Sequence, residues 1–153
     1  GSDNKFLVGI NGGYFLAGDY DLTYESTLGV ELQYVFSNKT RFHHFINTEF
    51  TVDLGVDGAN LFAFNAGIGT RYKLFSIRKR KLSISLIGGG LYLQENFSNQ
   101  VIGNVIETTD TSFSFFGNLG ISYPISKRFL FRIKAKQYGT KGTSAGAGIL
   151  FSF

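Results

Sequence analysis

The sequence contains no cysteine, one proline and two histidines among its 153 residues. Without cysteine the chain has no disulfide framework, no thiolate metal site and no cysteine nucleophile. It also lacks any run of about 18–20 consecutive apolar residues, the length that a transmembrane helix requires. The mean hydropathy of +0.04 is typical of a soluble protein. That interpretation fails if apolar and polar residues alternate, because a membrane-spanning strand shows lipid only every second side chain.

Glycine and aromatic residues are abundant, with 20 Gly, 17 Phe and 8 Tyr, and this composition favours β structure. Apolar and polar residues alternate with a period of two through almost the whole chain, and no convincing period of 3.6 is present. Eight alternating runs stand out. They span residues 5–18, 26–36, 41–56, 61–75, 81–95, 111–123, 128–138 and 143–153.

The lengths of these runs and of their connections favour a membrane barrel. Soluble strands usually have about five or six residues, whereas membrane strands need about nine to eleven. Longer loops alternate with tight turns, as in outer-membrane barrels. The loops span residues 19–25, 57–60, 96–110 and 139–142, and the turns span 37–39, 76–80 and 125–127. We therefore predict an all-β, eight-stranded antiparallel up-and-down transmembrane β-barrel, with both termini on the short-turn, periplasmic side.

The faces of the predicted strands differ in charge. One face of each strand has no Asp, Glu, Lys or Arg, as in the series Ala145, Ala147, Ile149. The opposite faces carry Glu31, Glu49, Asp53, Arg71, Lys73, Arg132, Lys134 and Lys136. A cation at the lipid midplane costs about 2–4 kcal/mol, so we expect the uncharged faces to contact lipid. A soluble barrel with an apolar lumen is the alternative, but the many Gly and Ser residues on the charged face fit a narrow interior better.

Aromatic residues gather at both ends of the uncharged faces, which resembles the two interfacial girdles of membrane barrels. The set near the short turns comprises Tyr34, Phe36, Phe42, Tyr72, Tyr123, Phe129, Phe151 and Phe153. The set towards the loops includes Tyr14 and Tyr92.

The charged residues of the predicted interior must be paired, because burial of an isolated charge is costly. We expect a salt-bridge network among the eight, with direct contact between Glu49 and Arg71 on neighbouring strands. Five cations face three anions, and water, anions or polar groups must satisfy the excess. A polar plug that sets the strand register is the main interpretation. A narrow gated ion pathway is the alternative.

The final residues, Gly146 to Phe153, alternate and end in phenylalanine. With Ile149, Phe151 and Phe153 on one face, they resemble the C-terminal β-signal that the barrel-assembly machinery reads. The layout of the whole chain is similar to that of the eight-stranded OmpA/OmpX-type barrels. The resemblance implies insertion into the bacterial outer membrane and contact with lipopolysaccharide and phospholipid. It implies no particular activity.

Residues for catalysis or metal binding are scarce. A histidine in catalysis needs a serine or carboxylate within hydrogen-bond reach, but Asp53 lies ten residues from His43 on the same face, or about 33 Å along a strand. His43 and His44 point to opposite faces, and no cysteine or carboxylate cluster joins them in a metal site. We expect no enzyme and no cofactor, with lipid A or phospholipid modification as the alternative.

Two short segments have an unusual composition, one being a basic run and the other a run of glycines. The basic run Arg78–Lys81 is expected to meet anionic lipid headgroups or solvent rather than nucleic acid. No helix follows Gly88–Gly90, so that run is not a phosphate loop, and we expect a bend, a bulge or space for a bulky neighbour.

The predicted loop 96–110 contains two apolar pairs around a Gly-Asn turn signal. The pairs are Val101 with Ile102 and Val105 with Ile106. We expect a small hairpin that contacts a protein partner, lipid or a host ligand, or that packs on the neighbouring loops.

The main functional hypothesis is a non-enzymatic outer-membrane protein with a structural or adhesion role, or a subunit of an outer-membrane complex. Residues 1–2 are expected to be a tag remnant, and residues 3–153 a single barrel domain.

Overall fold

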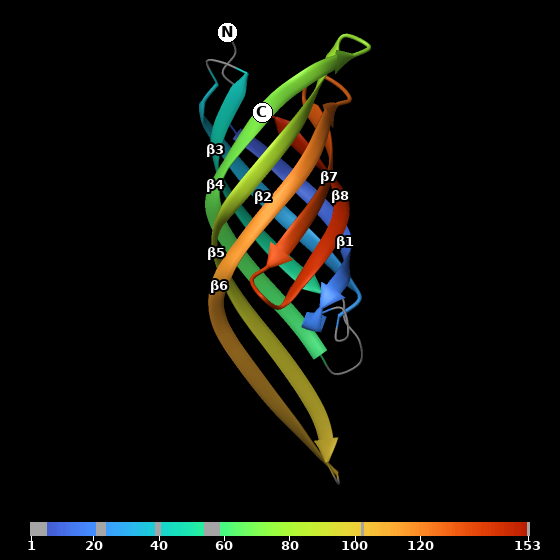
Figure 1. Ribbon diagram of the computed structural model, residues 1–153. Coiled ribbons are helices and arrows are strands. Elements are labelled where there is room, and N and C mark those ends of the chain that lie inside the picture. Colours follow the sequence, from blue (N-terminus) through green and yellow to red (C-terminus); the bar gives the residue numbers. More distant parts are fainter. Residues whose placement is uncertain (1–5, 21–23, 39–40, 54–58, 102, 153) are drawn as a thin grey trace.

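The computed structural model describes residues 6–20, 24–38, 41–53, 59–101 and 103–152, with the backbone alone described for 99–101 and 104–106 (Figure 1). Eight strands form in this part of the chain. They are β1 (Phe6–Gly18), β2 (Ser26–Ser37), β3 (Phe42–Asp53), β4 (Ala59–Ile77), β5 (Arg80–Val101), β6 (Asn104–Pro124), β7 (Phe129–Tyr138) and β8 (Gly142–Ser152). Each strand pairs antiparallel with the next, and β8 closes the barrel on β1. The predicted fold class is confirmed.

The strands follow the predicted runs closely except at β5 and β6. The predicted loop 96–110 instead continues both strands, which stay paired from Ser83 opposite Ser122 to Val101 opposite Asn104. Figure 1 shows this hairpin projecting well beyond the rest of the barrel. The projecting hairpin is therefore confirmed. Its expected partner contacts fall on Val101, Ile102, Val105 and Ile106, whose side chains lie outside the described residues, and stay a prediction.

The β4–β5 turn lies at the same end of the barrel as the start of β1 and the end of β8 (Figure 1). We call this the short-turn end and the opposite one the long-loop end. Arg78 and Lys79 have φ values of 51° and 68°, the left-handed conformations that a two-residue type I′ hairpin turn requires. Such turns favour Asn-Gly, so two long basic residues occupy a backbone that glycine adopts more readily.

Of the three alternatives predicted for Gly88–Gly90, the bulge is wrong, because β5 keeps its register with both neighbours across these residues. Gly89 instead lies opposite Gly67 where β4 and β5 approach closely. A Cβ atom on Gly89 would lie 2.2 Å from the carbonyl oxygen of Ala66. Glycine is thus required here by close backbone approach.

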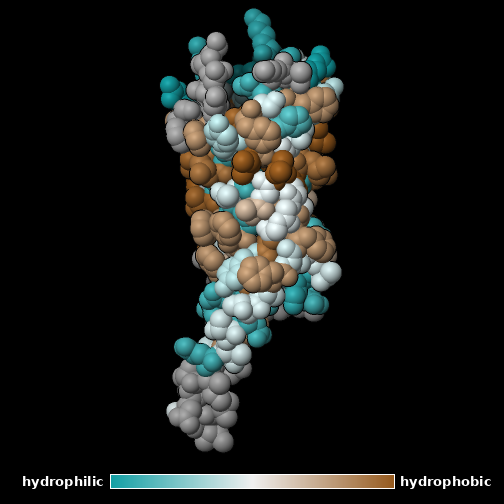
Figure 2. All heavy atoms as spheres, turned by 90° about the vertical axis from the view of Figure 1, so that its left-hand side faces the viewer, coloured by the Kyte–Doolittle hydropathy of each residue, from teal (hydrophilic) through white to brown (hydrophobic). Residues whose placement is uncertain are grey.

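The outer wall is apolar along the middle of the barrel. Ile10, Ile68 and Leu86 are each more than 60% exposed, whereas Glu31 and Glu49 are at most 1% exposed. Figure 2 shows the hydrophobic side chains as a belt between two hydrophilic ends. The prediction that uncharged faces point outward and charged faces inward is confirmed. The alternative of a soluble barrel with an apolar lumen is wrong.

The predicted girdle aromatics lie on the outer surface. Tyr14, Phe36, Phe42 and Phe129 are exposed, while Tyr34, Tyr72, Tyr92, Tyr123 and Phe151 are half-buried. Many pack in cross-strand pairs, such as Phe42 with Tyr72, whose ring centroids are 4.7 Å apart. Phe153, the last residue of the predicted girdle and assembly signal, lies outside the described residues, as do residues 1–2. Contact of these rings with lipid headgroups stays a prediction.

No helix within the described ranges is long and apolar enough to cross a membrane.

Candidate functional site

The centre of the lumen is an ionic layer built around Glu49 of β3. Lys134 and Lys136 of β7 each donate to one oxygen of its carboxylate at 2.7 Å. Asn11 of β1 donates to the same carboxylate at 2.7 Å, and Lys136 also donates to Asn65 of β4 at 2.5 Å. Alternation along four strands points these groups inward, so one buried anion ties together strands that are not neighbours.

A second ionic cluster lies nearer the short-turn end. The guanidinium of Arg132 donates two hydrogen bonds to the carboxylate of Glu31. Gln33 donates to Glu31 at 3.2 Å and accepts from Arg71 at 2.8 Å. Two guanidinium groups therefore share one carboxylate, and Arg71 reaches it only through a neutral amide.

The expected contact between Glu49 and Arg71 is wrong. Glu49 pairs with Asn65 of β4, whereas Arg71 pairs with His43. Six residues of β4 separate Asn65 from Arg71, or about 20 Å at the usual strand rise. The two residues share a face and neighbouring strands, but the register places them at different depths in the lumen.

The remaining two predicted network members lie at opposite ends of the lumen. Lys73 is half-buried at the short-turn end and forms no salt bridge with any described residue. Asp53 is buried at the far end of β3, towards the long loops. The predicted network therefore exists in its centre, with three salt bridges in the described residues.

An aromatic cluster, which we call the aromatic plug, fills the lumen at the long-loop end. It consists of Phe15, Tyr20, Tyr24 and Tyr138, all at most 4% exposed. The ring centroids of Phe15 lie 5.1 Å from Tyr138 and 5.4 Å from Tyr20, and Tyr20 meets Tyr24 edge to face at 5.2 Å. Strand alternation does not predict this plug, because Tyr20 and Tyr24 lie in the predicted loop 19–25.

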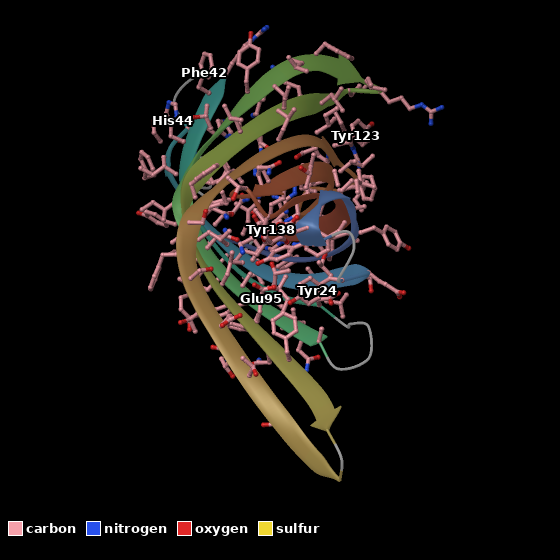
Figure 3. All side chains as sticks on the ribbon, turned by 60° about the horizontal axis from the view of Figure 1, so that its bottom comes forward. Tyr24, Phe42, His44, Glu95, Tyr123 and Tyr138 are labelled. Atoms are coloured by element: carbon pink, nitrogen blue, oxygen red, sulfur yellow. The ribbon has the colours of Figure 1, made fainter. Side chains whose placement is uncertain are left out.

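A polar contact fixes the plug to the base of the projecting hairpin. Tyr24 donates its hydroxyl hydrogen to the carboxylate of Glu95 in β5 at 2.9 Å, and Figure 3 shows the two side chains together below Tyr138. Burial, followed by the Glu95 carboxylate, raises the pKa of Tyr24 above that of a free tyrosine. The Tyr24 amide donates to the Tyr20 carbonyl at 2.8 Å. The four-residue Tyr spacing, typical of a helical turn, was the available signal.

The short-turn end contains a pocket of about 320 Å³ instead of a plug. We call it the basic mouth. Its basic lining residues are His43, Arg71, Lys73, Lys81, Lys127 and Arg128. Among the described residues that line it, none is Asp or Glu. The lumen is thus filled by aromatic rings at the long-loop end and lined by basic side chains at the short-turn end.

The two histidines occupy different environments. His43 lines the basic mouth, whereas the outward His44 contacts the Thr70 hydroxyl at 3.0 Å and stacks on Phe42 (Figure 3). His43 has no hydrogen bond to a hydroxyl or carboxylate of another described residue. The described ranges contain no group of three or more His, Cys, Asp or Glu residues that could hold a metal ion. Whether the protein is an enzyme stays a prediction.

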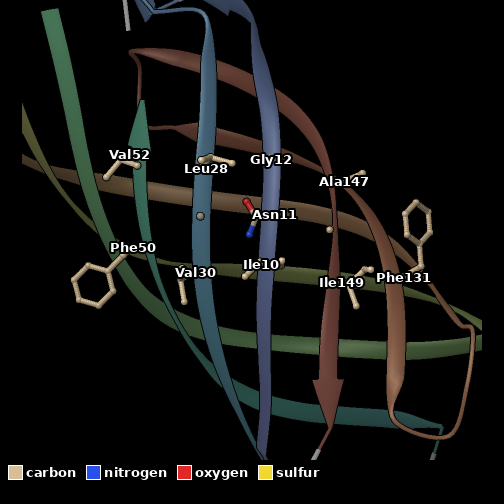
Figure 4. A pocket seen from close by; sticks show the side chains of 12 residues that line it. Ile10, Asn11, Gly12, Leu28, Val30, Phe50, Val52, Phe131, Ala147 and Ile149 are labelled. Atoms are coloured by element: carbon tan, nitrogen blue, oxygen red, sulfur yellow. The ribbon is translucent and has the colours of Figure 1, made fainter. Parts of the chain in front are cut away.

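A hollow of about 790 Å³ lies on the outer wall over β1, β2, β3, β7 and β8 (Figure 4). Its lining is almost wholly apolar and includes Ile10, Leu28, Phe50 and Ile149. Small residues such as Gly12 lower the wall between these larger side chains. Such a surface suits acyl chains.

No protein-family model and no curated protein matches the chain. Solved structures do match over nearly its full length. The N-terminal β-barrel domain of Pseudomonas aeruginosa OprF has a TM-score of 0.63 at 15% identity, covering 98% of each chain. The chain has the fold of a transmembrane β-barrel.

Other barrels of similar structure have different printed roles. The outer membrane enzyme PagL has a TM-score of 0.67 at 13% identity, covering 96% of this chain and 99% of its own. Ail, the attachment invasion locus protein of Yersinia pestis, has a TM-score of 0.61 at 12% identity, covering 95% of this barrel and 93% of its own. Because one neighbour is an enzyme and another an attachment protein, the fold leaves the role open.

Proposed function

We propose that this chain is a non-enzymatic barrel of the bacterial outer membrane that presents its β5–β6 hairpin to a protein partner, either on another cell or within a membrane complex. The observation that carries this proposal is the free edge of β6. β6 pairs with β7 only from Phe116 to Pro124. From Asn104 to Phe115 its sole strand neighbour among the described residues is β5.

The free edge has the chemistry of a docking site for another strand. Every second backbone N–H and C=O group along an unpaired edge points away from the sheet and is free to bond with an added strand. β5 also extends beyond β4, since its last partner there is Ala59 opposite Phe97. Among the described residues, the hairpin end therefore offers backbone edges on both sides.

The apolar outer wall supports placement in a membrane. In the proposed orientation the short turns face the periplasm and the hairpin faces the cell exterior. The wall contacts phospholipid and lipopolysaccharide, and the barrel-assembly machinery recognises Ile149, Phe151 and Phe153 during insertion. Replacement of the outward Ile10 by Arg is expected to lower the stability of the barrel in lipid vesicles by about 2–4 kcal/mol. Equal stability of Ile10→Arg and wild type in vesicles would contradict a lipid-facing wall.

A shortened hairpin tests the docking role. Residues 98–107 are replaced by Asn-Gly, so that a two-residue turn joins the paired Phe97 and Thr108. We expect the variant to fold, as judged by heat-modifiable migration on a detergent gel. Attachment of bacteria displaying it to host cells, or its cross-linking to a specific protein in native membranes, should fall to background.

The matched control replaces the loop residue Lys141 by Ser, at the same end of the barrel but outside the hairpin. It should keep wild-type attachment and cross-linking. If the shortened barrel folds and both readouts remain at the wild-type level, the hairpin has no docking role.

Two measurements separate this proposal from the other candidate functions. Incubation of the folded barrel with lipid A or phospholipid should leave the lipid masses unchanged by mass spectrometry. In planar bilayers the wild-type barrel should show no conductance steps, because the aromatic plug fills the lumen at the long-loop end. A modified lipid or regular conductance steps would favour the enzyme or the channel instead.

A further inference from the structure

We propose that the basic mouth at the short-turn end is a binding site for a phosphate-type oxyanion. The site collects six basic side chains from β3, β4, β5 and the β6–β7 turn around a pocket of about 320 Å³. The described lining contains no carboxylate. Positive charge is therefore concentrated in a concave site, and none of the described lining residues supplies a counter-ion.

The innermost cation, Arg71, provides the strongest argument. Its side chain is 5% exposed, and its hydrogen-bond partner among the described residues is the neutral Gln33. The Nε group of Arg71 is buried and has no hydrogen-bond partner in this part of the chain. A buried guanidinium is costly when no carboxylate of a described residue bonds to it directly, and an anion in the pocket that Arg71 lines would supply a direct charge and acceptor.

Neighbouring carboxylates are engaged elsewhere. Glu31 accepts two hydrogen bonds from Arg132, and Glu49 accepts from Lys134 and Lys136. Arg71 reaches Glu31 only through Gln33, and its guanidinium lies 4.9 Å from the centroid of the Phe45 ring. Among the described residues, no carboxylate bonds directly to Arg71, so an external anion can add the direct partner.

The mouth is also held in shape by bonds between its walls. Arg80 donates to the Pro124 carbonyl at 3.1 Å, and the Tyr123 hydroxyl donates to the Ile77 carbonyl at 3.0 Å. These bonds fix the β4–β5 hairpin against β6. The Ser126 hydroxyl accepts from the amides of Arg128 and Phe129 at 3.3 and 3.1 Å, which orders the turn carrying Lys127. A preorganised site loses less entropy when an anion binds.

The donor set fits a phosphate group. Guanidinium and ammonium groups bind tetrahedral oxyanions through several charge-assisted hydrogen bonds at once, and the Ser83 hydroxyl lines the same pocket. Leu7 and Phe129 add apolar surface at its margin, which leaves room for a phosphate that is esterified. Free phosphate and a phospholipid headgroup share this chemistry, and the experiment distinguishes them.

The test uses the full barrel refolded in a non-ionic, phosphate-free detergent, with inorganic phosphate as the probe in calorimetric titration. The double variant Lys73→Gln/Lys81→Gln removes two cations from the mouth at half-buried and exposed positions. We expect saturable binding to wild type and affinity about tenfold lower in this variant. Heat-modifiable migration verifies that both proteins are folded.

The matched control is Arg78→Asn/Lys79→Gly, which removes two cations from the same end but outside the pocket lining. Its affinity should stay within about twofold of wild type, because general attraction to exposed charges is weak and screened by salt. If the control loses as much affinity as the mouth variant, the site does not exist. The same holds if neither phosphate nor the lipid probe described next shows saturable binding to the wild-type barrel.

A second titration uses dihexanoyl phosphatidylglycerol below its micelle concentration. Mutual competition between this lipid and phosphate supports a site that accepts either source, whereas saturation by the lipid alone supports a headgroup site. The variant with the shortened β5–β6 hairpin should bind either probe as wild type does. The outcome is therefore independent of the proposed docking function at the other end.

Discussion

The two ends of the lumen differ in how far side chains fill them. At the long-loop end, Phe15, Tyr20, Tyr24 and Tyr138 pack together, and the Tyr24 hydroxyl meets the Glu95 carboxylate. At the short-turn end a pocket remains, and the described residues that line it include five Lys or Arg side chains without a carboxylate. One end is closed by its own side chains, while the other presents charge that an external group can satisfy.

This difference indicates where to look for function in a narrow barrel. Eight strands leave an interior that side chains can just fill, so a pocket lined by charged side chains is a feature that the fold does not require. The ionic layer around Glu49 lies between the two ends and is common to both. The following substitutions test the middle layer first and then each end.

The largest effect is expected from Glu49→Gln. The amide leaves the buried ammonium groups of Lys134 and Lys136 without their shared anion, and removal of one partner from a buried ion pair typically costs about 3–5 kcal/mol. Denaturant unfolding of the refolded barrel measures the loss. The exposed Glu107→Gln on the hairpin is the control and should be nearly neutral. A loss below about 1 kcal/mol for Glu49→Gln would show that this layer does not hold the two ends together.

Phe15→Ala opens the closed end. Truncation of a buried phenylalanine usually costs about 3–5 kcal/mol, and we expect about 3 kcal/mol here because the cavity adjoins the loop side. Conductance in planar bilayers should rise above the wild-type baseline. Phe113→Ala, which truncates an 84% exposed ring, should cost clearly less and leave conductance unchanged. Unaltered conductance in folded Phe15→Ala would mean that the plug is not the barrier.

The two plug tyrosines should respond to phenylalanine in opposite directions. Tyr24→Phe removes a hydrogen bond to a carboxylate and should destabilise the barrel by about 1.5 kcal/mol. The buried Tyr20 hydroxyl has no hydrogen-bond partner among the described residues, so Tyr20→Phe should stabilise by about 1 kcal/mol. Both variants keep the ring, and unfolding in parallel compares them directly. Equal losses in the two would contradict the assigned hydrogen bonding.

The smallest effect concerns the turn beside the open end. Arg78→Asn/Lys79→Gly places the preferred type I′ residues where both φ values are positive. We expect a gain in stability of about 1 kcal/mol or less, because relief of backbone strain is partly offset by the entropy of glycine in the unfolded chain. Denaturant midpoints measure it. A loss of stability would indicate that the basic side chains of this turn contribute contacts of their own.

The predicted strands and faces agree closely with the structure because a single physical rule determines them. Period-two alternation assigns each side chain to one face, so the inward Glu31, Glu49 and Arg132 and the outward Ile149 could be predicted individually. The predicted salt-bridge partner of Glu49 was wrong because pairing depends on the stagger between strands, which alternation does not encode. The plug was missed because Tyr20 and Tyr24 belong to a connection without strand periodicity.

The apolar outer wall and the charged interior follow from the sequence alone, since both depend on side-chain spacing along a single strand. The strand order follows from the short connections, which pair each strand with the next. The partners of each charge, the aromatic filling of one end and the basic pocket at the other follow from the folded barrel. Those outcomes depend on closure of β8 on β1 and on the register of all eight pairs, which set the depth of each inward side chain in the lumen.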